Sequence, residues 1–357
     1  MIRPLQGMRF FFAIFVLLSH YGDGTWGRLY AGGNVGVSYF FMLSGFVLAL
    51  GYKDRLTGDA RKGFSKTGFW RRRCSKIFLP HWLCLIATLL SCPWTLTTLH
   101  ELWPSALLLQ AWFPDPDIAL AGNRVSWFLS AMLFLYFLFP FIAPPLLRAS
   151  PRRSLVITAV TLVAYLPVMF AMPTDAENGG STFIEMWLYI FPPTRIFEFV
   201  FGIELFGLYE MLKGRVDISA KRATVAEAVA VLVVLATVPV FYMLEERYNT
   251  ALLFFVPTAL IILVMALTEG RPGAVSRFFT SRAMMWLGGI SFEFYLVHLT
   301  VLYVIEQFYR KAGISMPYVP GLLILIGLSV IVAVGLKYVV EMTHKGARRI
   351  MGGATDR

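Results

Sequence analysis

A histidine stands near the end of the first apolar stretch of the chain, where its imidazole could act as a general base. The stretch GMRFFFAIFVLLSHYGD runs from Gly7 to Asp23 and contains His20. Imidazole titrates near neutral pH, so it can take a proton from a hydroxyl group. Asp23 follows three residues later, and this helical spacing would let its carboxylate orient the ring or stabilise the imidazolium. The alternative is an interfacial histidine that meets water.

Basic side chains could bind phosphate groups at two places. Arg9 lies in the first apolar stretch, and the segment WRRRCSKIFLP (Trp70–Pro80) places Arg72, Arg73 and Lys76 before another apolar run. Arginine and lysine donate strong hydrogen bonds to phosphate oxygens, so a nucleotide-bearing cofactor such as coenzyme A would suit this cluster. The alternatives are an arginine that snorkels at position 9 and a basic anchor on anionic lipid headgroups.

Further polar residues interrupt the apolar runs, and an ionisable group within a membrane usually faces a cavity or a partner. Glu293 and His298 lie five apart in GGISFEFYLVHL. On an ideal helix they face directions about 140° apart, so they do not obviously pair. Ser44 lies within GVSYFFMLSGFVLALGY, where small residues favour close helix approach, a ligand or a local helix break. Trp127 and Tyr295 are candidates to line a site and to donate to an oxyanion.

The elements that position these residues are expected to be membrane-spanning helices. The chain has 357 residues, of which 57% are hydrophobic and 15% charged, and its mean hydropathy is +0.67. In a soluble domain about a quarter of the residues are charged. The lower charge content of this chain indicates that part of its surface faces lipid. Spanning helices need roughly 20 residues, which predicts an all-α integral membrane protein with about ten transmembrane helices. The apolar runs lie at about 8–22, 34–52, 77–95, 125–147, 154–172, 193–212, 224–244, 250–268, 284–308 and 319–341.

The distribution of basic residues predicts the orientation of these helices. An even number of spans puts both termini on one side, and most of the 32 Lys and Arg residues fall on that side. Cytoplasmic loops carry such an excess, so we expect both termini in the cytoplasm. This topology accounts for the net charge of +11 without a nucleic-acid partner. The opposite side receives Arg28, Arg124, Arg195, Arg247, Arg310 and Lys311.

The three cysteines predict neither a metal site nor a disulfide framework. Cys74, Cys84 and Cys92 lie within one stretch and lack the spacing of metal ligands. Two of them fall inside an apolar run, where a free cysteine behaves as a small buried hydrophobic residue. We therefore expect no metal ion.

The order of the motifs resembles the membrane-bound acyltransferase family 3, the O-acetyltransferase-like integral membrane acyltransferases. Its members begin with an R-x-L-x-G-x-R stretch, place a histidine at the end of the first helix, and continue with a G-V-x-x-F-F-x-L-S-G-F run. These features match Arg3 to Arg9, His20, and Gly36 to Phe46. The resemblance continues in the family's order through FWRRRCSKIFLPHW, SWFLSAMLFLYFLFP, RIFEFVFGIELFGL and LGGISFEFYLVHL, and so covers nearly the whole chain.

The resemblance implies transfer of an acyl group, usually acetyl, from cytoplasmic acyl-coenzyme A to a hydroxyl of an extracytoplasmic glycan such as an exopolysaccharide or lipopolysaccharide. It implies that His20 is the catalytic residue and that Arg9 belongs to the first family motif. The family's R-x-x-R pair is matched best by Arg73 and Lys76, where a lysine replaces the second arginine.

A site follows from these expectations: a passage through the helices that joins the inner basic residues to the imidazole. The catalytic residues would be His20 and Asp23. The donor, acetyl-coenzyme A, would contact Arg9, Arg72, Arg73, Lys76 and Ser44. The acceptor would contact Trp127, Glu293, Tyr295 and His298.

The expected organisation is a single transmembrane acyltransferase domain over residues 1–345 and a short basic cytoplasmic tail at residues 346–357. The expected location is the bacterial cytoplasmic (inner) membrane. The expected partners are acyl-coenzyme A, a glycan or lipid-linked saccharide acceptor and membrane lipids, with no nucleic acid; a homo-oligomer or a polysaccharide-synthesis complex stays open. The alternative functions are a multi-span transporter or flippase for a saccharide or lipid-linked intermediate, and a non-catalytic member of a synthesis complex.

Overall fold

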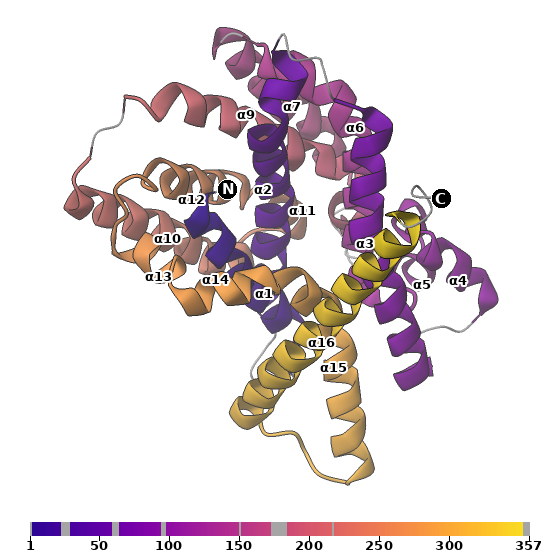
Figure 1. The fold of residues 1–357 in the computed structure, drawn as a ribbon. Helices are drawn as coiled ribbons and strands as arrows, with labels where there is room; N and C mark the ends of the chain where they lie inside the picture. The colour runs from indigo at the N-terminus through magenta and orange to yellow at the C-terminus, as the bar shows by residue number, and fades with distance from the viewer. Residues whose placement is uncertain are drawn as a thin grey trace.

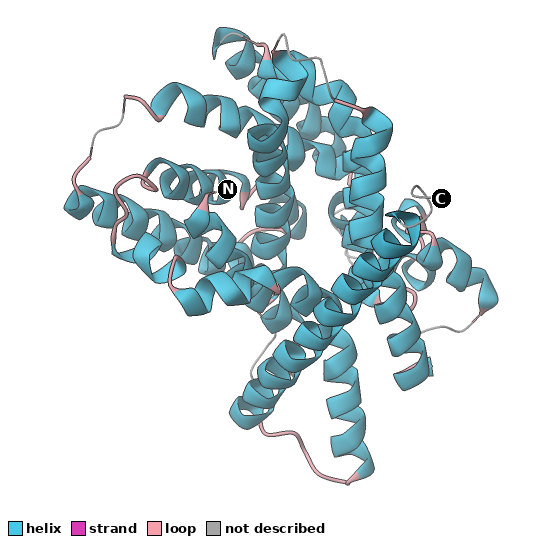
Figure 2. Cartoon of the chain, in the orientation of Figure 1, coloured by secondary structure: helices cyan, strands magenta, loops and turns pink. Residues whose placement is uncertain are grey.

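The computed structural model describes residues 2–22, 29–58, 64–93, 98–149, 151–172, 184–215 and 218–352. Within these ranges the chain forms helices joined by loops, with no strand, so the predicted all-α class is confirmed (Figures 1 and 2). The longer helices are α1 (Arg3–His20), α2 (Tyr30–Thr57), α3 (Lys66–Ser91), α6 (Trp127–Leu147), α7 (Pro151–Phe170), α9 (Ile196–Leu212), α10 (Ala220–Met243), α12 (Phe255–Leu267), α15 (Ser291–Lys311) and α16 (Tyr318–Gly352). The shorter ones are α4 (Leu99–Ala106), η2 (Gln110–Trp112), α5 (Pro116–Ala119), η3 (Arg124–Ser126), η5 (Glu185–Ile190), η6 (Pro192–Arg195), α11 (Glu246–Ala251), α13 (Ala274–Phe279) and α14 (Arg282–Gly289).

Each of the predicted apolar runs contains helix, but not every one of these helices has the length and hydropathy of a complete span. Among the described residues, six helices are long and apolar enough to cross a membrane, or seven if the bent pair α14 and α15 counts as one span. That pair bends by 66°. The other predicted spans are α1, α7 and α9, of which α9 has 17 residues and α7 an apolar part of only Val156–Phe170. The number of ten spans therefore stays a prediction, as does the cytoplasmic location of both termini.

Close backbone contacts hold the start of α1. A Cβ atom at Gly7 would lie 2.0 Å from the carbonyl oxygen of Phe279, and one at Gly288 would lie 2.1 Å from that of Gln6. Gln6 also donates from Nε2 to the carbonyl oxygen of Gly288 at 2.9 Å. The two glycines thus let α1 pack directly on α13 and α14, and this packing fixes the direction in which α1 carries His20.

A second pair of glycines lets α2 cross α9. A Cβ atom at Gly45 would lie 2.1 Å from the carbonyl oxygen of Phe199, and one at Gly202 would lie 2.0 Å from that of Met42. Helix α2 continues unbroken through this point. Of the three roles that the sequence left open for the small residues of α2, close helix approach therefore applies to Gly45.

Replacing Gly45 with alanine is expected to destabilise the protein, because the added methyl group would collide with a backbone carbonyl of α9. Overpacking of this kind costs about 1–3 kcal/mol. Gly51→Ala on the same helix is the matched control, since a Cβ atom there meets nothing within 4 Å. Alanine should stabilise the helix at that position by about 0.5–1 kcal/mol. Thermal unfolding in detergent measures both effects, and a wild-type midpoint for Gly45→Ala would contradict this account of the crossing.

The C-terminal end of α1 contacts the start of α16. The hydroxyl of Tyr21 donates to the carbonyl oxygen of Tyr318 at 2.6 Å. From there α16 runs as one helix to Gly352, so residues 346–352 of the predicted tail are helical. Residues 353–357 lie outside the described ranges.

Candidate active site

His20, the last residue of α1, lines a cavity of about 850 Å³, called here the His20 cavity. The predicted site residues Trp127 and Tyr295 line the same cavity. Ligand pockets typically measure about 300–1,000 Å³, so this space could hold a small ligand or part of a larger one. Its other polar or aromatic lining residues include Ser19, Tyr30, Asn34, Arg124, Glu185, Tyr189, Tyr242, Glu246, Asn249, Thr250, Tyr303 and Glu306.

A second imidazole lies beside His20. His298 of α15 is fully buried, and the centroids of the two rings are 5.5 Å apart. Nδ1 of His298 lies 2.7 Å from the carbonyl oxygen of Tyr295, and since a carbonyl only accepts, this nitrogen carries the proton. Nε2 of the neutral ring is then an acceptor, and it has no hydrogen-bond partner among the described residues. His298, predicted to bind substrate, thus lies next to the predicted base but does not itself line the cavity.

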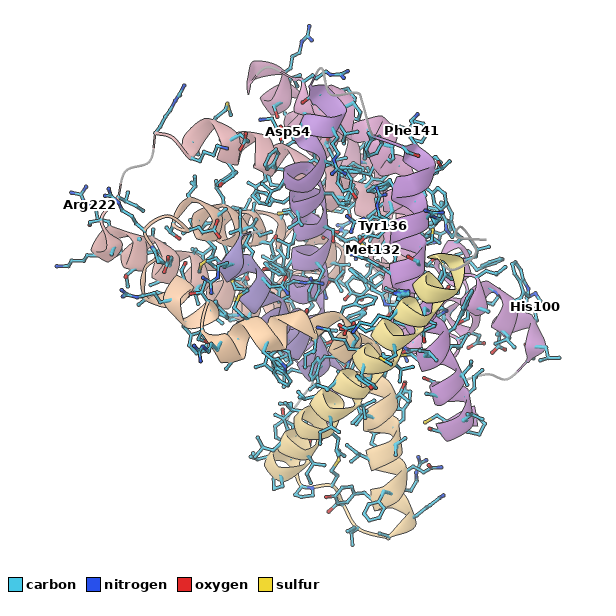
Figure 3. The ribbon with its side chains drawn as sticks, in the orientation of Figure 1. Asp54, His100, Met132, Tyr136, Phe141 and Arg222 are labelled. Atoms are coloured by element: carbon cyan, nitrogen blue, oxygen red, sulfur yellow. The ribbon has the colours of Figure 1, made fainter. Side chains whose placement is uncertain are left out.

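A smaller cavity of about 70 Å³, called here the Arg9 cavity, meets the His20 cavity at Tyr295, which lines both. Arg9 and Ser44, two residues predicted to contact the donor, line it together with Tyr136 of α6. Figure 3 labels Tyr136 and its neighbour Met132, which also lines this cavity. The Ser44 hydroxyl donates to a carbonyl oxygen of its own helix at 2.7 Å. The structure therefore places Arg9 and Ser44 in one cavity. Tyr295 lies between this cavity and the one that His20 lines.

In the basic cluster of α3, Arg73 packs against aromatic side chains, whereas Arg72 and Lys76 are exposed. The Arg73 guanidinium is half-buried and lies 5.5–5.8 Å from the centroids of three aromatic rings, of which Tyr136 is one. Because Tyr136 lines the Arg9 cavity, Arg73 contacts the wall of that cavity from outside. Arg72 and Lys76 are exposed on the same helix. None of the three lines either cavity.

Two other predicted residues take no described part in these cavities. Glu293 of α15 lines neither of them. Its carboxyl group interacts electrostatically with Lys337 and Arg9, and its Oε2 is buried without a hydrogen-bond partner among the described residues. Asp23 lies outside the described residues, so its pairing with His20 stays a prediction.

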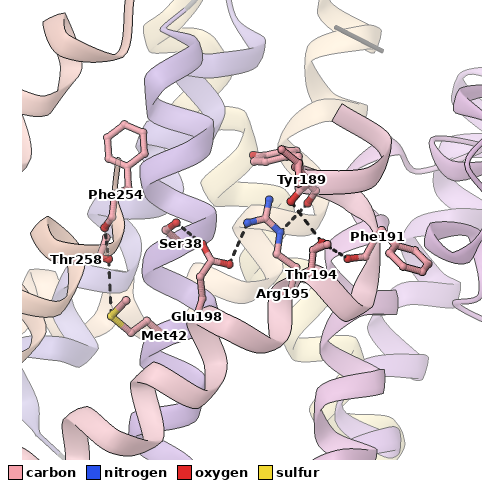
Figure 4. A network of polar contacts seen from close by, with 10 residues as sticks. Ser38, Met42, Tyr189, Phe191, Thr194, Arg195, Glu198, Phe254 and Thr258 are labelled. Carbon is pink, nitrogen blue, oxygen red and sulfur yellow. Dashed lines mark hydrogen bonds and ion pairs between the residues drawn. The ribbon is translucent and has the colours of Figure 1, made fainter. Parts of the chain in front are cut away.

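A buried ion pair that the sequence analysis did not predict contacts two residues that line the His20 cavity. Figure 4 shows the hydrogen bonds of this pair. Nη1 of Arg195 is 3.0 Å from Oε2 of Glu198, and the two side chains are 3% and 2% exposed. Arg195 also donates from Nε to the carbonyl oxygen of Tyr189 at 2.7 Å, and Glu198 accepts from the hydroxyl of Ser38 on α2. One sequence signal was available: the two residues lie three apart in PPTRIFEF, and an arginine beside an apolar run needs a partner.

This ion pair supports one wall of the His20 cavity. The Arg195 guanidinium lies 4.7 Å from the ring centroid of Tyr189 and 6.0 Å from that of Trp127. The two rings are 4.9 Å apart, and both line the cavity. Contacts between a cation and aromatic faces stabilise such an arrangement, more strongly when they are desolvated. Arg195 is therefore placed to fix these two rings.

Carboxylates give the described lining of the His20 cavity an acidic character. Glu185, Glu246 and Glu306 line it, and Arg124 lies among them. Burial raises the pKa of the Glu185 carboxyl, and the charge of Arg124 opposes this shift. Over the described ranges, no three His, Cys, Asp or Glu side chains are grouped so that they could hold a metal ion. Carboxylate oxygens accept hydrogen bonds, so this lining suits an organic ligand that carries hydroxyl groups.

The helices that form both cavities match a known family. A family model described as "Acyltransferase domain" matches residues 3–338, which include every residue that lines either cavity. The chain belongs to this acyltransferase family. Together with its apolar helices, this membership makes the protein a multi-pass membrane acyltransferase.

Two relatives of this acyltransferase carry the activity in their names. Acyltransferase MdmB from Streptomyces mycarofaciens is 31% identical over 392 aligned positions, which cover 99% of this chain and 95% of MdmB. O-acetyltransferase OatA from Staphylococcus aureus is 20% identical over 337 positions, which cover 87% of this chain and 52% of OatA. No solved structure matches the chain.

Proposed function

We propose that this acyltransferase moves an acetyl group from cytoplasmic acetyl-coenzyme A to a hydroxyl of an extracytoplasmic saccharide, in the bacterial cytoplasmic membrane. The observation that carries the proposal is the meeting of two cavities at Tyr295. One contains His20, whose imidazole suits general-base catalysis, and the other contains Arg9, whose guanidinium suits an anionic or carbonyl oxygen. Two substrates that approach from opposite sides of a membrane need such paired spaces.

The donor is proposed to approach from the start of α3. The exposed Arg72 and Lys76, together with the half-buried Arg73, would hold coenzyme A phosphates through charge-assisted hydrogen bonds, and Arg73 contacts Tyr136 in the wall of the Arg9 cavity. The thin pantetheine arm would then extend into that cavity and bring the thioester to Tyr295. This route places the start of α3 on the cytoplasmic side, in agreement with its excess of basic residues.

The acceptor is proposed to occupy the His20 cavity. Its aromatic rings offer flat apolar surfaces for sugar rings, and its carboxylates and amides can hydrogen-bond hydroxyl groups. The name of OatA, an O-acetyltransferase, agrees with an oxygen atom as the receiving group. A saccharide of the cell envelope is therefore the proposed acceptor class.

His20 would take the proton of the acceptor hydroxyl while that oxygen attacks the thioester carbonyl carbon. A carbon–oxygen bond forms, the carbon–sulfur bond breaks, and the proton passes from the imidazolium to the departing sulfur of coenzyme A. His298 does not line this cavity, but its ring lies 5.5 Å from that of His20, and its Nε2 would accept a hydrogen bond from the imidazolium and so favour the protonated form of His20. Asp23 would stabilise that form from the other side.

The test uses the purified protein in proteoliposomes, acetyl-coenzyme A labelled in its acetyl group, and glycan fragments of bacterial envelopes. The expected result is a labelled ester on a saccharide hydroxyl and an equal amount of free coenzyme A thiol. Saccharide movement across the vesicle membrane without thiol release would instead indicate a transporter and would overturn the proposal.

Replacing Arg73 with alanine is expected to raise KM for acetyl-coenzyme A more than it changes kcat. Hydrogen bonds to charged groups contribute about 1.5–3 kcal/mol, which corresponds to at least about a tenfold rise in KM. Arg71→Ala is the control, because this exposed arginine on the same helix is not assigned a ligand. If Arg73→Ala lowers only the unfolding temperature and leaves KM unchanged, its role is packing against the aromatic rings.

A further inference from the structure

We infer that Phe40, Phe128 and Tyr295 form an aromatic partition that positions the thioester and keeps water of the His20 cavity away from it until an acceptor is bound. The inference rests on the proposed function and adds the residues that separate its two substrates. Each ring comes from a different helix, namely α2, α6 and α15. The partition therefore depends on how these helices pack and not on one loop.

The three rings close a triangle between the cavities. The ring centroids are 6.1 Å apart for Phe40 and Phe128, 6.2 Å for Phe40 and Tyr295, and 5.4 Å for Phe128 and Tyr295. Their planes are tilted by 59–67°, as in the edge-to-face contacts that aromatic pairs favour. Phe40 and Phe128 line the Arg9 cavity, whereas Tyr295 lines both cavities. Tyr295 is thus the residue that the two linings share, and Phe40 and Phe128 pack against it on the side of the Arg9 cavity.

A hydrogen bond fixes the ring that faces both sides. The Tyr295 hydroxyl donates to the carbonyl oxygen of Val125 at 3.0 Å, and Val125 also lines the His20 cavity. The side chain of Tyr295 is 4% exposed, so breaking this bond without a replacement has a cost. The thioester can reach the His20 cavity only if this ring moves, and an acceptor bound in that cavity would supply the contacts that replace those the ring loses.

The reaction needs such a partition because water competes with the acceptor. A cavity of about 850 Å³ lined by carboxylates and amides holds water when no acceptor is bound. His20 would activate a water molecule as it activates a hydroxyl. The water oxygen would bond to the thioester carbon, the carbon–sulfur bond would break, and the proton would reach sulfur, giving acetate and free coenzyme A. An open passage would thus consume the donor without product.

The test measures release of coenzyme A thiol from acetyl-coenzyme A in the absence of acceptor. We expect Tyr295→Ala and Phe128→Ala to raise this rate at least about tenfold over the wild type, because a ring is lost. Tyr295→Phe keeps the ring and loses the hydrogen bond, so we expect a rise of about fivefold. Tyr165→Phe is the matched control: Tyr165 is 2% exposed, lies in a separate small cluster of α7 and η5, and should leave the rate unchanged.

A second measurement does not depend on turnover. Ser44→Cys places a thiol in the Arg9 cavity, and a membrane-impermeant thiol reagent is added on the side of the His20 cavity. We expect label above the background of the parent protein only when Ser44→Cys is combined with Tyr295→Ala or Phe128→Ala. Equal labelling of Ser44→Cys with and without those changes would overturn the partition.

The two proposals fail in different ways. If the wild type acetylates a saccharide but the alanine variants and Tyr295→Phe release no more thiol than the wild type, the partition is wrong and the proposed function stands. If the wild type acetylates no saccharide, the proposed function is wrong and the partition falls with it. If the alanine variants do not fold, the rate of thiol release by Tyr295→Phe in the absence of acceptor decides. A rate equal to that of the wild type would then overturn the partition.

Discussion

His20→Ala is expected to lower kcat/KM for acyl transfer by about 10²–10⁴-fold, the contribution of a positioned general base. The imidazole lies at the end of α1, in the cavity assigned to the acceptor, and 5.5 Å ring to ring from His298. The latter imidazole is buried away from the lining of that cavity, so it cannot replace the missing base. Transfer to a saccharide, followed by mass spectrometry of the product, measures the loss.

His100→Ala is the control for this prediction. His100 is exposed on α4 at the edge of the molecule (Figure 3), so its loss should leave transfer unchanged. Binding of acetyl-coenzyme A should survive in His20→Ala, because His20 does not line the Arg9 cavity. Activity of His20→Ala near that of the wild type would remove His20 from the chemistry.

The second large effect concerns the buried ion pair. Arg195→Ala and Glu198→Ala are each expected to lower the free energy of unfolding by about 3–5 kcal/mol, because each change leaves one buried charge without its partner. The Arg195→Ala variant should also raise KM for the acceptor, since the guanidinium contacts the rings of Tyr189 and Trp127 in the His20 cavity. Denaturation in detergent and acceptor kinetics measure the two effects separately.

Two comparisons sharpen this prediction. Lys53 and Glu210 form a pair that is 35% and 22% exposed, so Lys53→Ala should cost no more than about 1 kcal/mol. The double replacement of Arg195 by Met and Glu198 by Leu removes both charges and should recover most of the lost stability. Equal losses for Arg195→Ala and Lys53→Ala would contradict the account of a desolvated pair.

The helical architecture was predictable from sequence because apolar runs of sufficient length have few alternatives in lipid. The number of complete spans was not, since α9 has only 17 residues and buries Glu198 and Glu204, and the apolar part of α7 is only Val156–Phe170. The crossing at Gly45 illustrates the same limit. A glycine in an apolar run permits close approach, but only the position of Phe199 on α9 decides that it does so.

The site, like the fold, was predictable only in part. His20 and Trp127 were expected together, and the structure places both in one cavity, with Tyr295 at its junction to Arg9. Local chemistry marked these residues, since each is unusual within or beside an apolar run. Arg195 was missed because the charge count treated it only as one of the basic residues on the outer side, whereas its burial depends on Glu198 and Tyr189 in three dimensions. A pattern of residues along the chain does not show which side chains contact each other in the folded protein.

The two cavities are lined by different parts of the chain, and this has a consequence for how such enzymes diversify. The end of α10 and the short helix α11 supply residues of the His20 cavity and none of the Arg9 cavity. Exchange of this segment would therefore reshape the cavity proposed for the acceptor while leaving the Arg9 cavity, proposed for the thioester, intact. A lineage that keeps one common activated metabolite could thus acquire new recipients through small, local changes in one surface hairpin.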